Sequence, residues 1–459
     1  METIIEEECD KLKRKLCGLS RILSVSEMEL FARTEVNEML LRILKAYAEE
    51  LDLAIYEDKA GRKADGMVVE RRGLNRQVLT EIGVLSYDRT YYALKDGTYG
   101  CPVDTVIGVD PHQRVSAHVV LRLTEEAKKF SYSDSSRIVT NGNVSRQTVM
   151  NAVRRCRAKE DVVAEKRKVP VLHIDADENH VSLQNGRNVM IPLATVYEGL
   201  EHIGIGGKGR NRCIRPFQHG TCGIQETFWE EVYQKLDNRY DLDEVRIYLH
   251  GDGAAWIKQG LNVLPNCTFV LDSYHKNKAK KMAFGGCMAG EATTEKRLLE
   301  EAFRLGDRMK LEAVWRSLLK KHPERRKAIN QAMGYLRENL DAIAVRYHDA
   351  EARNGGATEP HISHTLSSRL SSRPMGWSRE TLEHLVPILA QGTFELIACN
   401  SPRKEPKCIE KATKRVTRHA RKKIGTFLPN PDIMLHFVAV SNGKVTQLYR
   451  TLRDIQTRC

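Results

Sequence analysis

The spacing of apolar residues along the first hundred positions predicts helices followed by a small β unit. From Ser26 to Ile55 apolar residues recur every three or four positions, which gives a helix one face for packing against a core. We therefore expect helices over residues 1 to about 56. Strand-like segments follow over residues 66–105, where Asp96-Gly97 is typical of a tight hairpin turn.

Two short helices are expected after the β unit, one beginning at Thr124 and one after Ser145. Ser145 is a favoured N-cap residue, so Arg146, Gln147 and Thr148 would occupy the first turn of the second helix. In a helix-turn-helix motif this turn contacts base edges or phosphates. An ordinary helical hairpin with a basic exposed face explains the same residues equally well.

Near residue 168 the pattern changes to apolar strands that end in acidic residues. The expected strands are Val169–Asp177, His180–Gln184, Val189–Tyr197, Val245–Leu249 and Cys267–Leu271, with a helix at Glu226–Leu236 between the third and the fourth. The chain after Asp272 is helical for about 75 residues, with one apolar face formed by Leu311, Val314, Trp315, Leu318 and Leu319. This order predicts an α/β fold with an RNase H-like mixed sheet, interrupted by an all-α insertion.

Composition limits the class of protein. At 459 residues the chain is long enough for two or three domains. It contains no run of about 18 apolar residues, so we expect no transmembrane helix, and its acidic N-terminus is unlike a signal peptide. Eleven cysteines without a Cys-x-x-Cys pair argue against zinc ribbons and a disulfide framework. We expect a reduced protein of the cytoplasm that does not bind membranes.

The net charge of +13 indicates a polyanionic partner, and much of it is concentrated near the C-terminus. Between Pro402 and Lys423 ten Lys or Arg stand against two Glu. Four of these basic residues share one face at helical spacing, which predicts DNA binding, although a solvated helix face would look similar: Lys411, Lys414, Arg415 and Arg418.

Replacing these four residues by Ala should reduce the salt dependence of DNA binding by up to about four units of logarithmic slope, because each neutralised phosphate releases counterions. Measuring affinity over a series of salt concentrations tests this, and an unchanged slope would place the segment away from DNA.

Acidic residues at the ends of the predicted strands carry the chemical signal. Attack on a phosphodiester develops negative charge on two oxygens, which two divalent cations about 4 Å apart stabilise together. Mg²⁺ prefers carboxylate oxygens, which must converge from separate elements. Asp175 and Asp177 lie two apart and face the same side of a strand. We favour Asp177 as the ligand and Asp175 or Glu178 as a supporting acid. Taken alone, these acids would more often mark a strand leading into a turn.

Three further positions fit such a site. Asp252 follows an apolar strand and has a glycine on each side, which allows close approach of a phosphate. Asp272 and His275 share a helical turn, where His275 could orient Asp272, bind a phosphate or cap the helix. Glu359 precedes Pro360, a residue that suits the first turn of a helix. Each of these acids alone has an ordinary turn or surface explanation.

Four longer motifs contain these residues: Ala176-Asp177-Glu178-Asn179-His180-Val-Ser-Leu-Gln184, His250-Gly-Asp252-Gly-Ala-Ala-Trp256-Ile, Leu271-Asp-Ser-Tyr-His-Lys, and His361-Ile-Ser-His-Thr-Leu-Ser-Ser-Arg-Leu-Ser-Ser-Arg-Pro-Met-Gly-Trp377-Ser. Together they resemble the ISLre-type insertion-sequence transposases, a DDE family allied to the Mutator-like group. The resemblance covers most of the chain. Where members of that family carry Glu-Gly ahead of the last motif, this chain has Glu359-Pro360.

The resemblance implies a catalytic, metal-binding triad of Asp177, Asp252 and Glu359, with Asp272 and His275 matching the Asp-x-x-His signature of the Mutator-like group. It implies two Mg²⁺ ions, with Mn²⁺ as a substitute. The implied partner is double-stranded DNA, both the ends of the element and the target. Because two ends are processed together, we expect a homo-oligomer.

The sequence therefore predicts a DDE transposase that cleaves DNA at the ends of its insertion sequence and transfers the strand. The alternative is a catalytically inactive DNA-binding regulator derived from such an enzyme. A glycosidase using Asp175 and Asp177 is disfavoured by the low aromatic content of 6%. The expected regions are a helical N-terminus (1–65), a hairpin and helix-turn-helix DNA-binding region (66–165), a first part of the core (166–275), the insertion (276–350), a second part of the core with Glu359 (351–400) and a basic C-terminus (401–459).

Overall fold

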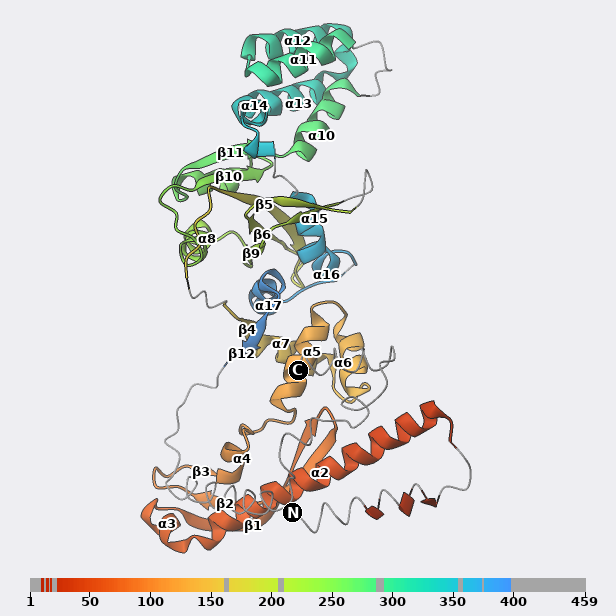
Figure 1. Cartoon of the computed structure of the whole chain (residues 1–459), viewed down its shortest axis with the longest axis vertical. Helices are drawn as coiled ribbons and strands as arrows, with labels where there is room; N and C mark the ends of the chain where they lie inside the picture. The colour runs from red at the N-terminus through yellow and green to blue at the C-terminus, as the bar shows by residue number, and fades with distance from the viewer. Residues whose placement is uncertain are drawn as a thin grey trace, which may run out of the picture. The chain divides into compact units, whose positions relative to one another are not determined.

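In the computed structural model the chain forms two compact units, and the boundary between them follows Val119 (Figure 1). The two units are described separately. The structure describes residues 10–11, 14–15, 17–18, 23–160, 165–204, 210–285, 293–353, 358–373 and 375–397. The basic residues Lys411, Lys414, Arg415 and Arg418 lie outside these ranges.

The first unit packs one long helix against a small antiparallel sheet. Helix α2 (Val25–Glu57) begins at a capping box, in which the backbone amide of Glu27 donates to the Ser24 hydroxyl and the Glu27 carboxylate accepts from the Ser24 amide. Its later turns bury Leu51 and Ile55 against the sheet. The helix predicted from the apolar spacing is confirmed.

Strands β1 (Val68–Thr80) and β2 (Gly83–Ala93) form an antiparallel hairpin, and β3 (Tyr99–Gly100) pairs with β2. The expected turn at Asp96-Gly97 joins β2 to β3, where the Leu94 amide donates to the Thr98 carbonyl over 2.8 Å. The unit also contains the short helices α3 (Lys59–Ala64) and α4 (Pro102–Val106).

A five-stranded mixed sheet lies in the middle of the second unit. Its strands are β5 (Val171–Ser182), β6 (Asn188–Tyr197), β9 (Phe217–Gly220), β10 (Arg246–Gly251) and β11 (Cys267–Leu271). Their order across the sheet is β11-β10-β5-β6-β9. Strand β10 runs parallel to both β5 and β11, whereas β6 is antiparallel to β5 and β9. The sheet is therefore parallel on one side of β5 and antiparallel on the other.

Alternation along β5 gives the sheet two different faces. Leu172 and Ile174 join the main apolar core together with Phe228 and Val232 of helix α8 (Phe228–Asp237), which covers that face. The opposite face carries buried polar side chains, including those of His173 and Asp175. Helix α15 (Thr358–Ile362) contacts the sheet at β5 and β6. In Figure 1 α8 and α15 lie on opposite sides of the sheet.

The chain after β11 forms the expected all-helical insertion. Its helices are α10 (Ser273–Phe284), α11 (Thr293–Leu305), α12 (Arg308–Lys321), α13 (Arg326–Glu338) and α14 (Leu340–His348), with a single 3₁₀ turn η3 (Pro323–Arg325). The apolar face predicted on α12 is confirmed, because Leu311, Val314 and Leu318 are buried in the core that also contains the α8 face of the sheet. The insertion and the sheet thus share one core.

The chain then returns to the sheet as one helical run. It comprises α15, a π-helical turn η5 (Ser363–Ser367) and α16 (Ser368–Leu370). Helix α17 (Arg379–Gln391) and strand β12 (Phe394–Leu396) follow, and β12 pairs with β4 (Cys156–Ala158). Smaller elements near the sheet are the paired strands β7 (Leu200–Ile203) and β8 (Arg210–Cys213), helix α9 (Ala255–Lys258) and the 3₁₀ turns η2 (Gln259–Asn262) and η4 (Glu351–Arg353).

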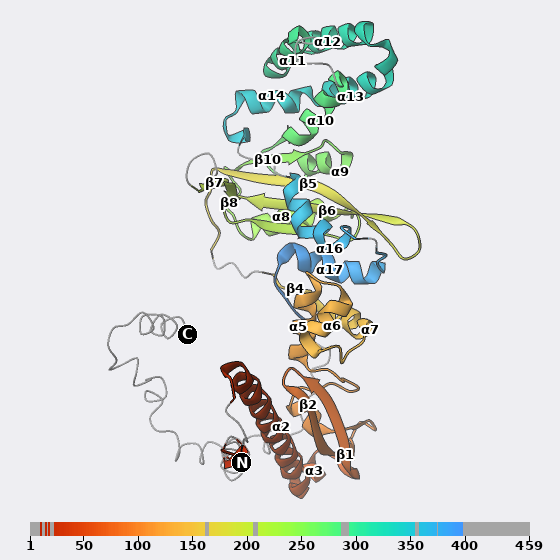
Figure 2. The ribbon, with the colours of Figure 1, turned by 90° about the vertical axis from the view of Figure 1, so that its right-hand side faces the viewer.

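Two predictions about the sheet were wrong in detail. The strands expected at Val169–Asp177 and His180–Gln184 are one strand, because the polar residues between them stay paired and Asn179 lies opposite Ile191 of β6. Figure 2 shows β5 and β6 extending together beyond the sheet as a hairpin. Strands β7, β8 and β9 were not predicted.

The helix expected to begin at Thr124 instead ends near it, because α5 spans Ala117–Ala127. Helix α6 (Tyr132–Thr140) was not predicted; it is capped by Ser131, whose hydroxyl accepts from the Asp134 amide. The β1–β2 hairpin and helices α6 and α7 (Arg146–Arg154) belong to different units, whereas the sequence placed them in one region, 66–165.

Within the described ranges no helix is both long and apolar enough to span a bilayer. The six cysteines in those ranges are free thiols.

Candidate active site where strands β10 and β11 end beside β5

The strand register places three aspartates next to one another, where β10 and β11 end beside the middle of β5. His250 of β10 lies opposite Asp175 of β5, so Asp252, two residues further on, is level with Asp177. The backbone amide of Asp272 donates to the carbonyl of Gly251 over 2.9 Å, which extends the β10–β11 pairing by one residue. Asp177, Asp252 and Asp272 therefore follow one another across three adjacent parallel strands.

Asp177 is half-buried, and burial raises the pKa of its carboxyl group to about 6. Glu178 and Asp252 raise this pKa further, while the backbone amide of Glu178, which donates to Asp177 over 2.8 Å, and the imidazole of His275 lower it. Partly desolvated carboxylates that repel one another favour the binding of a cation.

The loop that carries Asp252 depends on its flanking glycines. A Cβ atom on Gly251 would lie 3.0 Å from the carbonyl oxygen of Ala176, and one on Gly253, whose φ is 91°, would lie 2.7 Å from Oδ1 of Asn339. The Asp252 carboxylate accepts from the Ala254 amide over 2.8 Å. The loop therefore has one tight conformation with the Asp252 side chain held at its start.

Helix α13 of the insertion supports the same loop. The Tyr335 hydroxyl donates to the carbonyl oxygen of Asp252 over 2.6 Å. Asn339, which follows α13, packs against Gly253 and accepts from Lys258 over 3.0 Å. Burial, with the charges of Asp252 and Asp272, raises the pKa of Tyr335, so its hydroxyl remains a donor. The insertion is thus part of the framework of the site, a role that the sequence did not reveal.

Asp272 and His275 form an ion pair beside these acids. Asp272 is the N-cap of α10, where its carboxylate accepts from the Tyr274 amide over 3.2 Å. Nδ1 of His275 lies 3.4 Å from Oδ2 of Asp272. The hydrogen bond with Asp272 raises the pKa of His275 despite burial, and the charges of Asp252 and Asp177 raise it further. The neighbouring acids therefore favour the protonated form of His275.

Glu178 and Asp175 support the site without sharing its edge. The Glu178 carboxylate accepts from Nε1 of Trp256 over 2.8 Å, which ties β5 to the helix after Asp252. Asp175 is 2% exposed and accepts from the Tyr197 hydroxyl over 3.1 Å. Its buried position suits an anchor better than a solvent-facing ligand, which favours Asp177 over Asp175 as the first ligand.

Asp175 also holds the helix that contains Glu359. Nε2 of His361, on α15, lies 3.4 Å from Oδ2 of Asp175. Burial lowers the pKa of His361, but hydrogen bonds with Asp175 and Cys213 outweigh it and raise the pKa to about 9. Glu359 lies two residues before His361 in the first turn of α15, as its Pro360 neighbour predicted. The side chain of Glu359 itself lies outside the described part of the structure.

Stacked aromatic rings fill the polar face of the sheet beneath Asp175. The ring of His173 stacks on those of Tyr197, Tyr248 and His250, at centroid distances of 5.3, 5.6 and 5.4 Å. Nδ1 of His173 and Nε2 of His250 are 3.2 Å apart. Burial lowers the pKa of both histidines, that of His250 to about 4, so both are neutral near pH 7. Alternation along β5 places His173 on this face, but its partners come from other strands.

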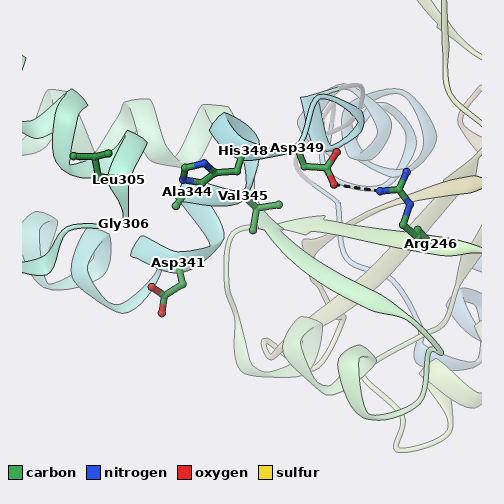
Figure 3. A pocket seen from close by; sticks show the side chains of 8 residues that line it. All are labelled: Arg246, Leu305, Gly306, Asp341, Ala344, Val345, His348 and Asp349. Carbon is green, nitrogen blue, oxygen red and sulfur yellow. Dashed lines mark ion pairs between the residues drawn. The ribbon is translucent and has the colours of Figure 1, made fainter.

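No group of three or more His, Cys, Asp or Glu side chains close enough to hold a metal ion occurs within the described ranges. Asp177 and Asp252 are two members of the expected triad, and the Glu359 side chain is not among the described groups. A hollow of about 700 Å³, drawn in Figure 3, lies elsewhere. It is bordered by Arg246, at the start of β10, and by Asp349, 3.6 Å away in an ion pair, and so lies at the opposite end of β10 from Asp252.

The helix turn expected after Ser145 is present as the first turn of α7. Ser145 is the N-cap of α7 and accepts from the Thr148 amide over 3.2 Å. Arg146 and Gln147 in the first turn are exposed. At the end of the helix Arg154 forms an ion pair with Glu380 over 2.8 Å.

These features define an α/β protein with a mixed sheet, an all-helical insertion and a group of aspartates where β10 and β11 end beside β5. The chain belongs to the UPF0236 family, an uncharacterised protein family whose model matches residues 19–395. It is 33% identical over 449 residues to a UPF0236 protein of Caldanaerobacter subterraneus subsp. tengcongensis, covering 93% of this chain and 91% of the relative. Another UPF0236 protein of that organism, whose name joins eleven gene designations, is 32% identical with the same coverage. A UPF0236 protein of Streptococcus gallolyticus, named for a vanSb 3′ region, is 25% identical over 57% of this chain and 59% of its own length.

Proposed function

We propose that this protein is a DDE-type transposase, which cleaves DNA at the ends of its own insertion sequence and joins the freed strand to a target. The observation that carries the proposal is the placement of Asp177 and Asp252 side by side on adjacent parallel strands. Carboxylates in this arrangement suit Mg²⁺, and helix α15, whose His361 pairs with Asp175, has Glu359 in its first turn.

The chemistry that two Mg²⁺ ions supply at such a site is stabilisation of negative charge on the attacking and leaving oxygens of a phosphodiester. Asp177 and Asp252 would bind them, with Glu359 completing the set. The protonated form of His275, which pairs with Asp272, would offset part of the negative charge of Asp177 and Asp252. The glycines on either side of Asp252 let its loop pack closely against Ala176 and Asn339, which would hold the Asp252 carboxylate in a fixed place. No side chain needs to form a covalent intermediate.

The order of the strands supports an RNase H-like interpretation of the sheet. Along the chain, three antiparallel strands are followed by helix α8 and then by two parallel strands, each leading into an aspartate. An insertion and the helix that contains the last acid come next. Across the sheet the strand order is β11-β10-β5-β6-β9. The relative whose name joins eleven gene designations of one organism is also compatible with a mobile sequence, because mobile elements multiply within a genome.

DNA binding in this proposal uses the exposed first turn of α7, with Ser145, Arg146, Gln147 and Thr148, as a recognition helix that contacts double-stranded DNA of the element ends. The net charge of +13 favours such a partner. Joining two ends calls for a homo-oligomer in the cytoplasm. A DNA-binding regulator without catalysis is the second candidate, and the presence of all three acids argues against it.

Cleavage of a labelled duplex tests the proposal. The full-length protein is incubated with the terminus of its own element in Mg²⁺, beside a duplex of scrambled sequence and a reaction with EDTA. We expect nicks at the terminus that leave a 3′-OH, only on the element sequence and only with Mg²⁺. Binding of the terminus without cleavage in Mg²⁺ or Mn²⁺ would favour the regulator instead.

Replacing His361 by Gln should lower cleavage about 10- to 100-fold, because residues that support metal ligands typically have effects of that size. The change removes the ion pair with Asp175 that positions α15, so the Mg²⁺ concentration for half-maximal cleavage should rise while DNA affinity stays the same. His322→Gln, in the helical insertion, is the matched control. A loss of thermal stability without any change in Mg²⁺ dependence would show that the pair is only structural.

A further inference from the structure

A second polar hollow in the same unit has a strongly basic lining. Its volume is about 380 Å³. It lies where the end of α5, the run η5–α16 and the end of α17 meet, and its lining is Lys128, Lys129, His364, Thr365, Ser368, Arg369, Leu389 and Gly392. None of these eight residues is acidic.

Arg369 is the most unusual residue of the lining, because its side chain is buried without an opposite charge. Arg369 is 6% exposed, and its guanidinium lies between the rings of Trp377 and Tyr132, at 4.6 and 5.6 Å from their centroids. Its Nε donates to the Ala127 carbonyl over 2.6 Å. Among the residues that the structure describes, no carboxylate forms an ion pair with it. A guanidinium stays protonated even when buried, so this charge lacks a counterion.

The remaining donors surround the same space. Lys128 donates to the Gly392 carbonyl over 2.7 Å and pairs with Glu125 over 2.8 Å, so its charge is partly balanced. Lys129 is exposed at the rim. Thr365 and Ser368 add hydroxyl groups. Guanidinium, ammonium and hydroxyl groups are the donors that bind phosphate oxygens in DNA complexes.

We propose that this hollow binds a phosphodiester of the DNA strand that is presented for cleavage. This inference rests on the proposed function and adds a contact that fixes where the strand lies. Ser368, which lines the hollow, lies on the same helical run as Glu359. At about 1.5 Å per residue it lies roughly 14 Å from Glu359 along that run. At about 3.4 Å per base pair that distance corresponds to roughly four base pairs of duplex. The bound phosphate is therefore several nucleotides from the scissile one.

Neutral linkages in the DNA test the contact one phosphate at a time. A set of terminal duplexes, each with a single uncharged methylphosphonate, is titrated with the full-length wild type, with Lys129→Ala and with Lys320→Ala, an exposed lysine of α12 that serves as control. We expect a methylphosphonate at one or two adjacent positions, three to five nucleotides from the cleavage site, to weaken DNA binding by the wild type and by Lys320→Ala about three- to tenfold. In Lys129→Ala the effect of those positions should disappear, while the other positions keep theirs.

Each result decides between the two proposals. If Lys129→Ala and the wild type give the same interference profile, the hollow does not bind DNA, although cleavage by the wild type would leave the transposase proposal intact. If the wild type neither binds nor cleaves the terminal duplex, both proposals fail. Arg369→Lys, which keeps the charge but not the planar fork, provides a second variant and should also weaken the effect at those positions.

Discussion

Replacing Asp252 by Asn should abolish Mg²⁺-dependent cleavage of the element terminus, by at least about a thousandfold, and leave binding of the terminus intact. Removal of one ligand of a two-ion site eliminates the charge stabilisation that both oxygens of the phosphodiester need. The Asn side chain keeps the size of Asp and can still accept from the Ala254 amide, a bond of 2.8 Å in the wild type. The fold of the loop should therefore survive, and gel-shift and cleavage assays on the same preparation separate binding from chemistry.

The control for this variant is Asp349→Asn, which changes an aspartate at the opposite end of β10, where it pairs with Arg246. It should cleave like the wild type. If Asp252→Asn loses binding and thermal stability together, then Asp252 is a structural residue of the loop and the proposed site is wrong.

Replacing Asp177 by Asn should stabilise the protein at pH 7.5 in the absence of divalent cations while it abolishes cleavage. Burial raises the pKa of Asp177 from the ordinary 3.8 to about 6, so the neutral form is favoured in the folded state. The stability that this group contributes is present below about pH 4 and is lost as the pH rises through 6, because the unfolded chain ionises more readily. At pH 7.5 the Asn variant avoids that loss, which we expect to be worth on the order of 2 kcal/mol.

Thermal unfolding with and without Mg²⁺ measures this effect. The wild type should be stabilised by Mg²⁺, because a ligand that binds only the folded state shifts the equilibrium toward it. The Asn variant should be more stable than the wild type without Mg²⁺, should gain little from its addition, and should lose its advantage at pH 4. An Asn variant that is less stable than the wild type at pH 7.5 would mean that the Asp177 carboxylate makes a favourable contact in the folded protein.

The fold could be predicted from the sequence where local patterns decide it. The apolar stripe of α12 and the Asp96-Gly97 turn needed only neighbouring residues. The break expected before His180 was wrong because polar residues remain in a strand when a partner strand pairs with them, and pairing is not visible in one segment. Helix α6 was missed because capping by Ser131 stabilises a sequence of low apolar content.

The acids of the site could be predicted one at a time, but not their arrangement. Strand ends indicated Asp177 and Asp252, whereas their alignment depends on the register between β5 and β10. The support from Tyr335 comes from a residue 83 positions further along the chain than Asp252, in a helix whose own pattern indicated only packing. The link from His361 to Asp175 likewise joins two distant segments, and neither residue type alone distinguishes an anchor from a ligand.

Mapping the metal by localised cleavage of the polypeptide tests the central claim most directly. The full-length protein is loaded with Fe²⁺ in place of Mg²⁺ in the presence of the terminal duplex, treated with ascorbate and peroxide, and its backbone cuts are located by mass spectrometry. The account predicts cuts in three segments, around Asp177, around Asp252 and around Glu359, all suppressed by excess Mg²⁺ and absent from Asp252→Asn. Cuts that leave out the segments around Asp177 and Asp252, or that persist in Asp252→Asn, would contradict a metal site shared by these acids.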